Sequence, residues 1–169
     1  MSSIYDKLTD ITTFVFDVDG VFTDSRILLM EDGTLLRSMN VRDGYAIKIA
    51  LQEGFQIHII TGGSSAGVVK RLKGLGITDI HIGIRDKISV LNEIMEKNEL
   101  TPDELLYMGD DEIDVPCLQL AGFSCAPHDA DVSALNAAEY VSHKKGGDGC
   151  VREVVQMVLE AQSKWKILI

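Results

Sequence analysis

Short apolar runs alternate with segments of helical periodicity along most of this chain, and this alternation constrains its fold more than any other feature. The runs typical of buried strands cover residues 14–16, 55–60, 80–82, 105–108 and 123–125. Apolar residues at helical spacing predict helices over residues 44–53, 65–75, 86–98 and 151–165, and a further helix through Leu118 and Leu120. Strands that alternate with helices of this length predict a Rossmann-like α/β fold, a parallel sheet with helices on both faces. With no repeat or linker, we expect one domain over residues 1–169.

A β-hairpin insertion is predicted directly after the first strand. Residues 26–30 and 34–39 read as two strands, and the Asp32-Gly33 turn between them is a strong hairpin signal. Asp43 is the expected N-cap of the helix that follows, and Gly54 its stop.

Composition excludes several classes of partner. The chain has 26 acidic residues against 16 lysines and arginines, a formal net charge of −10, so we expect no nucleic-acid or anionic-membrane partner. Cys117, Cys125 and Cys150 are an odd number without CxxC spacing, which predicts buried, reduced thiols. No targeting segment and no apolar run of membrane-spanning length is seen, so we expect a cytoplasmic protein.

The first apolar run ends in two carboxylates. Phe14-Val15-Phe16 is followed by Asp17-Val18-Asp19-Gly20, and the alternation of strand side chains places Asp17 and Asp19 on the same side. Two such charges repel each other unless a cation or a shared proton relieves them. Ligands of open α/β sheets bind at the carboxyl ends of the strands, so we expect the functional site here.

Other polar residues follow later strands and belong with this pair. Thr61 follows the second strand of the predicted sheet, Lys87 begins a helix, and a later strand is followed by three further acids, Asp110, Asp111 and Asp114. Mg²⁺ prefers oxygen ligands and is commonly held by one or two carboxylates with phosphate and water. A lysine and a hydroxyl group neutralise and orient the remaining phosphate oxygens. The set therefore predicts a hard cation beside a phosphate. Asp114 has a second reading, as the cap of the helix after it.

The order of these motifs resembles the haloacid dehalogenase superfamily of phosphohydrolases. The matching segments are Asp17-Val18-Asp19-Gly20-Val21-Phe22-Thr23, Thr61-Gly62, Lys87 and Gly109-Asp110-Asp111-Glu112-Ile113-Asp114. The resemblance implies that Asp17 is the nucleophile and that Asp19 is the general acid and base. It implies phosphate binding by Thr61, Gly62 and Lys87. Mg²⁺ would be held by Asp17, the Asp19 carbonyl and Asp110, with support from Asp111 and Asp114.

The segments between these motifs leave no room for the cap domain that many members of the superfamily carry. Residues 21–42 hold little more than the hairpin, and residues 61–87 hold one helix and one strand. We therefore expect the active site to be covered by neighbouring subunits, with the exposed leucines of the hairpin as a candidate interface.

The resemblance narrows to the 3-deoxy-D-manno-octulosonate 8-phosphate (KDO 8-phosphate) phosphatases. It is carried by residues 17–24, Asn40-Val41-Arg42-Asp43-Gly44-Tyr45, the strand-end motifs and Lys145-Gly146-Gly147-Asp148-Gly149-Cys150-Val151-Arg152-Glu153. That family is capless and tetrameric and serves lipopolysaccharide synthesis. The resemblance implies that Arg42 helps to form the substrate pocket and that the stretch around Lys145 lies near a neighbouring site. Gly63 departs from the family, many members of which have arginine there, and Arg71 is the candidate to compensate.

Three other functions stay open from the sequence. The first is a phosphatase for a nine-carbon 2-keto-3-deoxy sugar acid, and the Asn-Val-Arg-Asp-Gly stretch of residues 40–44 favours the eight-carbon substrate over it. The second is a phospho-signalling receiver, whose acceptor aspartate follows a later strand than Asp17 does. The third is a non-catalytic assembly domain. This function is disfavoured because all four residues that catalysis needs are present, namely Asp17, Asp19, Lys87 and Asp110.

Overall fold

Residues 4–166 are described by the computed structural model, and six of the strands in this range form one parallel sheet. Its strands are β1 (Thr13–Phe16), β4 (Gln56–Ile60), β5 (Asp79–His81), β6 (Leu105–Met108), β7 (Phe123–Ala126) and β8 (Tyr140–Val141). The helices are α1 (Ile4–Asp10), α2 (Val41–Gln52), α3 (Ala66–Leu75), α4 (Lys87–Lys97), α5 (Val115–Leu120), α6 (Val132–Ala137) and α7 (Cys150–Ala161), with 3₁₀ turns η1 (Pro102–Glu104) and η2 (Glu112–Asp114). The sheet order is β5-β4-β1-β6-β7-β8.

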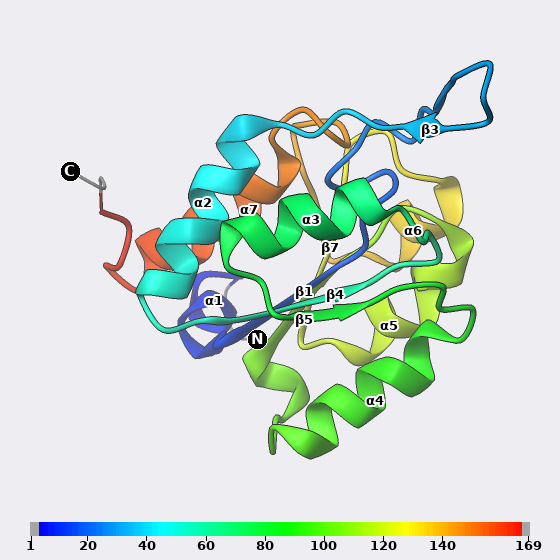
Figure 1. The fold of residues 1–169 in the computed structure, drawn as a ribbon. Helices are drawn as coiled ribbons and strands as arrows, with labels where there is room; N and C mark the ends of the chain where they lie inside the picture. Colours follow the sequence, from blue (N-terminus) through cyan, green and yellow to red (C-terminus); the bar gives the residue numbers. More distant parts are fainter. Residues whose placement is uncertain (1–3, 167–169) are drawn as a thin grey trace.

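Helices cover both faces of the sheet, and the alternation of side chains along β1 shows why. Phe14 and Phe16 belong to a buried cluster with side chains of α1, α2, α3 and α7. Val15 points to the other face, where the cluster includes side chains of α4, α5 and α6. Burial of both faces requires strands that are apolar throughout, as β1 and β6 are. The predicted fold class is therefore confirmed (Figure 1).

The strand register places the carboxyl ends of β1, β4 and β6 side by side at one edge of the sheet. Phe16, the last residue of β1, is the register partner of Ile59 in β4 and of Met108 in β6. The strands are parallel, so the loops after all three leave the sheet at the same edge. Residues that follow these strands, far apart in sequence, become neighbours there.

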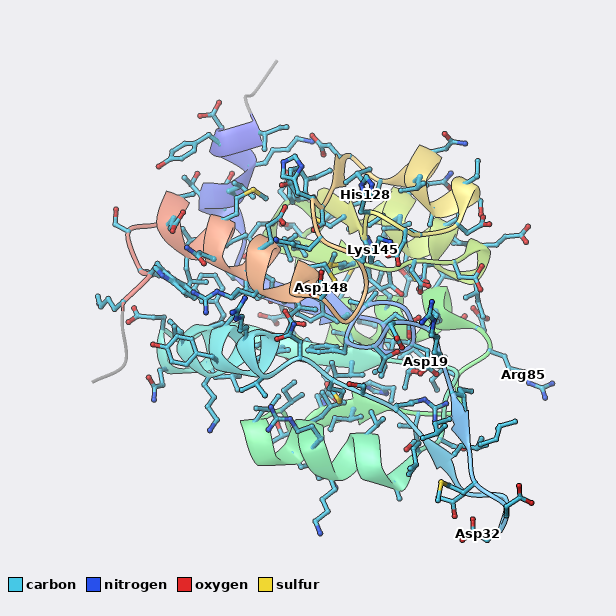
Figure 2. The ribbon with its side chains drawn as sticks, turned by 90° about the horizontal axis from the view of Figure 1, so that it is seen from above. Asp19, Asp32, Arg85, His128, Lys145 and Asp148 are labelled. Atoms are coloured by element: carbon cyan, nitrogen blue, oxygen red, sulfur yellow. The ribbon has the colours of Figure 1, made fainter. Side chains whose placement is uncertain are left out.

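The predicted hairpin is present and projects away from the body of the molecule. It consists of β2 (Leu28–Leu29) and β3 (Leu35–Leu36), shorter than the predicted strands, and Asp32 lies at its tip (Figure 2). Leu28 and Leu29 are 64% and 72% exposed, although both are large apolar residues. Among residues 4–166 there is no cap domain, as predicted.

One helix begins differently from its prediction. Asn40, not Asp43, is the N-cap of α2, and its side chain accepts a hydrogen bond from the backbone N–H of Arg42. Asp43 is buried and instead accepts a hydrogen bond from the backbone N–H of Arg152 (2.8 Å), in the first turn of α7. Since the N-cap of α7 is Gly149, which offers no side chain, Asp43 supplies the missing acceptor from another helix.

The cysteine prediction is confirmed, because all three cysteines are buried and free. No helix within residues 4–166 combines the length and the apolarity needed to cross a membrane.

Candidate active site

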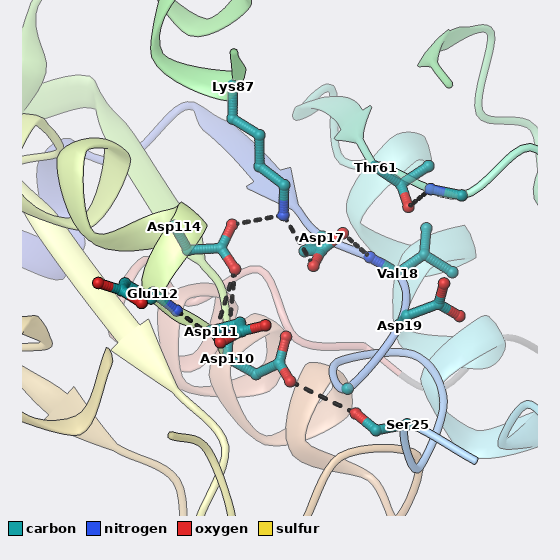
Figure 3. A network of polar contacts seen from close by, with 12 residues as sticks. Asp17, Val18, Asp19, Ser25, Thr61, Lys87, Asp110, Asp111, Glu112 and Asp114 are labelled. Atoms are coloured by element: carbon teal, nitrogen blue, oxygen red, sulfur yellow. Dashed lines mark hydrogen bonds and ion pairs between the residues drawn. The ribbon is translucent and has the colours of Figure 1, made fainter. Parts of the chain in front are cut away.

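The candidate active site lies where β1, β4 and β6 end. Asp17 follows β1 directly and donates its backbone N–H to the carbonyl of Met108 (3.0 Å). Thr61 follows β4 directly, and Asp110 comes two residues after the end of β6. Lys87 is the first residue of α4 and reaches the same place from the other side of the site (Figure 3). The structure thus brings together four residues whose positions span almost a hundred residues of sequence.

Lys87 is a buried cation between two carboxylates. Its Nζ lies 2.8 Å from Oδ2 of Asp17 and 2.7 Å from Oδ1 of Asp114, and its side chain is only 2% exposed (Figure 3). Burial lowers the pKa of the Lys87 ammonium, but the two carboxylates outweigh burial, so the pKa is raised overall. Lys87 is therefore protonated at neutral pH and oriented toward Asp17.

Asp114 organises the site through four accepted hydrogen bonds. Its Oδ1 accepts from Lys87 and from the hydroxyl of Tyr107 (2.6 Å), and its Oδ2 accepts from the backbone N–H groups of Asp110 and Asp111 (3.2 Å each). Asp114 occupies the N-cap position of α5, as its alternative interpretation expects, but its side chain makes no capping hydrogen bond to that helix. Both oxygens are fully used, and the residue holds the loop after β6 in position.

The remaining negative charges are poorly compensated. Burial raises the pKa of Asp17 to about 6, although Lys87 opposes this effect. Burial also raises the pKa of Asp110 to about 7, and the charges of Asp17 and Asp114 add to the increase. Both shifts mean that the folded protein resists ionising these carboxyls without a further cation.

The residues present fit a divalent metal ion. Asp17, Asp110 and Asp114 each offer an oxygen, and the three atoms lie within 4.8 Å of one another. Oδ1 of Asp110 is buried without a hydrogen-bond partner, which is costly unless a ligand meets it. An all-oxygen set favours a hard cation such as Mg²⁺. Since Asp114 is already saturated, Asp17 and Asp110 are the carboxylates free to bind it.

Asp111 and Asp19 lie outside this cluster. The side chain of Asp111 accepts a hydrogen bond from the N–H of Glu112 and caps η2. Asp19 points away from Asp17 (Figure 3) and is engaged by Arg37, whose Nε lies 2.6 Å from Oδ1 of Asp19 and whose Nη2 lies 3.3 Å from Oδ2. The two aspartates of the first motif therefore face different cations. Sequence reasoning missed Arg37, which comes from the hairpin.

Two glycines allow the loops to approach this closely. Gly20 has a φ of +88°, and a Cβ added to it would lie 1.8 Å from Oδ2 of Asp110. A Cβ on Gly109 would lie 2.3 Å from Cγ of Asp114. Any side chain at either position would displace a carboxylate of the site. Ser25, another residue that the sequence did not single out, donates to Oδ2 of Asp110 (3.4 Å; Figure 3).

An open cleft of about 240 Å³ lies over these groups. It is lined by Asp17, Asp19, Ser25, Thr61, Gly62, Gly63, Lys87, Asp110, Asp111 and Ile113. Thr61 is buried, and its Oγ1 accepts from the N–H of Gly63 (3.2 Å). This set combines a buried carboxylate, a buried ammonium, a hydroxyl group and a place for a cation, which are the groups that phosphoryl transfer requires.

Three predicted substrate-binding residues do not line this cleft. Arg42 is exposed at the start of α2, on a surface shared with Arg152. Arg71 lies on α3 and lines a neighbouring groove. Lys145 precedes Gly147, whose N–H donates to the carbonyl of Val21 (2.9 Å), so its loop packs against the loop after β1.

Comparison with known proteins agrees with this site. Residues 79–154 match the family model of haloacid dehalogenase-like hydrolases. Over 158 residues the chain is 39% identical to the 3-deoxy-D-manno-octulosonate 8-phosphate phosphatase of Escherichia coli strain K12, which covers 94% of this chain and 84% of that protein.

Solved structures agree with the fold as well. The phosphatase of the same description from Moraxella catarrhalis, in complex with magnesium ion, phosphate ion and KDO, is 36% identical, with a TM-score of 0.92 over 95% of this chain and 92% of that chain. The cobalt-bound enzyme from Haemophilus influenzae is 33% identical, with a TM-score of 0.88 over 93% and 92%. The resemblance seen in the motifs is confirmed, and this chain belongs to the 3-deoxy-D-manno-octulosonate 8-phosphate phosphatase family of haloacid dehalogenase-like hydrolases.

Proposed function

We propose that this chain is a Mg²⁺-dependent phosphatase that hydrolyses KDO 8-phosphate to KDO and phosphate, in lipopolysaccharide precursor synthesis. The observation that carries the proposal is the placement of Asp17 at the floor of the cleft, 2.8 Å from the buried Lys87 ammonium and beside the unpartnered oxygen of Asp110. The identity of the substrate is inferred from the family, because the relatives that are 39% identical are named as KDO 8-phosphate phosphatases.

Two steps follow from the residues. With Asp19 in its protonated form, a carboxylate oxygen of Asp17 attacks phosphorus, and the bond to the sugar oxygen breaks as Asp19 gives that oxygen its proton. Asp19, now ionised, then takes a proton from a water molecule that attacks the phosphorus of the aspartyl-phosphate, which releases phosphate and restores Asp17. Lys87, the Thr61 hydroxyl and the Gly62 backbone N–H bind the phosphoryl oxygens throughout.

In this proposal Asp17, the Asp19 carbonyl and Asp110 hold Mg²⁺, with Asp111 and Asp114 in support. When bound, the ion neutralises negative charge shared between the phosphate and these carboxylates. Asp114 contributes by position, since it fixes both Lys87 and the backbone that carries Asp110.

The protein is further proposed to act as a single domain in a cytoplasmic homotetramer, in which neighbouring subunits cover each cleft. The exposed leucines of the hairpin and the lack of a cap within residues 4–166 support this assembly, and the free cysteines support the compartment. Arg42 and Lys145 would then contact substrate bound to a neighbouring subunit, because neither lines the cleft of its own chain.

A substrate panel tests the proposal. Purified protein with Mg²⁺ is assayed against KDO 8-phosphate, a nine-carbon 2-keto-3-deoxy sugar acid 9-phosphate and simple sugar phosphates, with Asp17→Asn as the control for contaminating phosphatases. We expect the highest kcat/KM with KDO 8-phosphate and no activity in the variant. Preference for the nine-carbon substrate would favour the alternative phosphatase, and equal, poor turnover of all substrates would defeat the assignment.

A further inference from the structure

Arg37 is a buried cation beside the predicted general acid. It follows β3, and its side chain is only 9% exposed although the hairpin around it projects into solvent. Two of its nitrogens lie 2.6 Å and 3.3 Å from the two oxygens of Asp19. A guanidinium carries five N–H donors, and Asp19 engages two of its nitrogens. Arg37 therefore keeps donors for a second carboxylate while it holds the first.

Gly63 leaves space next to this guanidinium. A Cβ at this position would lie 3.1 Å from Oδ2 of Asp19, 3.5 Å from Oγ1 of Thr61 and 3.9 Å from Nη2 of Arg37. A long side chain here would occupy the space between the phosphate-binding threonine and the arginine. The absence of a side chain keeps Arg37 open to whatever is bound in the cleft.

A large groove continues from Arg37 between the hairpin and α3. It encloses about 670 Å³ and is lined by Thr34, Leu35, Leu36, Arg37, Met39, Ser64, Ser65, Ala66, Gly67, Val68 and Arg71. This lining contains two arginines and no acidic residue, in a chain whose formal net charge is −10. Nη2 of Arg71 lies over α2, where a Cβ on Gly44 would approach it to 2.6 Å. Although Arg37 shares its charge with Asp19, the only charged side chains in this lining are positive, which favours an anion.

We infer that Arg37 binds the carboxylate of the sugar-acid substrate, with the sugar lying in this groove and Arg71 at its far wall. The inference rests on the proposed function, because it assigns the second anionic group of that substrate. Its geometry also ties recognition to chemistry. The guanidinium that would bind the substrate carboxylate also orients Asp19. A substrate with an acid group at the right distance therefore has its ester oxygen held next to Asp19.

Two substrates that differ in the carboxylate test the inference. The variants Arg37→Gln, Arg37→Lys and Arg71→Gln are compared with wild type on KDO 8-phosphate and on p-nitrophenyl phosphate, which has no carboxylate. For Arg37→Gln we expect a loss in kcat/KM that is at least about 30-fold greater with KDO 8-phosphate than with p-nitrophenyl phosphate. Arg37→Lys should recover part of this loss, and Arg71→Gln should give a smaller loss with the same selectivity.

The controls separate the possible failures. Arg85→Gln removes the same charge from a side chain that projects into solvent near the site (Figure 2), and it should change neither activity. Equal losses on both substrates in Arg37→Gln, in protein with a wild-type melting temperature, would show that Arg37 only orients Asp19 and would overturn the inference. Wild-type protein that does not prefer KDO 8-phosphate over esters without a carboxylate would instead refute the proposed function.

Discussion

Asp17→Asn should abolish catalysis and yet stabilise the metal-free protein at neutral pH. The ionised Asp17 is buried beside Asp114, and these effects exceed the attraction of Lys87, so its pKa is about 6 instead of the usual 3.8. A carboxyl whose pKa is raised by folding makes its full contribution to stability below pH 4, where it is protonated in both states. That contribution is lost as the pH rises through about 6.

The magnitude follows from the two pKa values. Because one pKa unit corresponds to about 1.36 kcal/mol, a rise from 3.8 to about 6 makes ionisation of Asp17 cost the folded state up to about 3 kcal/mol above pH 7. The asparagine side chain does not titrate, and Lys87 retains Asp114 as its partner. About 1 kcal/mol of this cost is already present at pH 4.5, so the free energy of unfolding of the variant minus that of wild type should increase by about 2 kcal/mol between pH 4.5 and pH 7.5.

Urea unfolding followed by circular dichroism, in EDTA at pH 4.5, 6.0 and 7.5, measures this difference. Asp103→Asn, at an exposed aspartate outside the site, serves as the control and should show no such trend. At pH 7.5 Mg²⁺ should then stabilise wild type more than Asp17→Asn, because the ion needs the charged carboxylate. If the difference in unfolding free energy between the two proteins is the same at all three pH values, then the ionised Asp17 carboxylate does not destabilise the fold and the reasoning is refuted.

Three further variants probe the loops, the core of the site and the hairpin. Gly20→Ala should weaken Mg²⁺ binding at least about tenfold in calorimetry, because the added Cβ displaces Asp110. Gly33 has a similar φ but no atom of residues 4–166 within 4 Å of such a Cβ. Gly33→Ala should therefore leave Mg²⁺ binding unchanged and lower only the free energy of unfolding, by the about 1–2 kcal/mol that a left-handed backbone costs alanine. Asp114→Asn should lower the free energy of unfolding by about 3–5 kcal/mol in urea, and a loss under about 1 kcal/mol would contradict its role. If the proposed tetramer forms through the hairpin, Leu29→Glu should lower the mass measured by light scattering and lower activity; an unchanged mass would place the interface elsewhere.

The strand ends could be predicted from the sequence because local chemistry marks them. At Asp17 and Thr61 an apolar run stops at a polar residue, and such a change occurs where the chain leaves a buried sheet. Parallel topology then places all such ends at one edge without knowledge of any contact.

Residues that act through tertiary contacts left no such signal. Tyr107 lies inside an apolar strand and reads as core, yet its hydroxyl holds Asp114. Asp43 has the local sequence of a helix cap but caps α7, more than a hundred residues away, which only the packing of α2 on α7 decides. Arg37 reaches Asp19 from the base of the hairpin, directly after β3, and this contact depends on the whole fold.

The structure also changes the interpretation of the Asp17 and Asp19 pair. From the sequence the two carboxylates are expected to repel each other, but the like charge that most raises the pKa of Asp17 is Asp114. Each member of the pair has its own cation, Lys87 for Asp17 and Arg37 for Asp19. Lys87 is held in the core of the site, whereas Arg37 comes from the hairpin and borders the groove. In the proposed mechanism Lys87 therefore binds the phosphoryl group that every substrate shares, whereas Arg37 contacts the part of the molecule in which substrates differ.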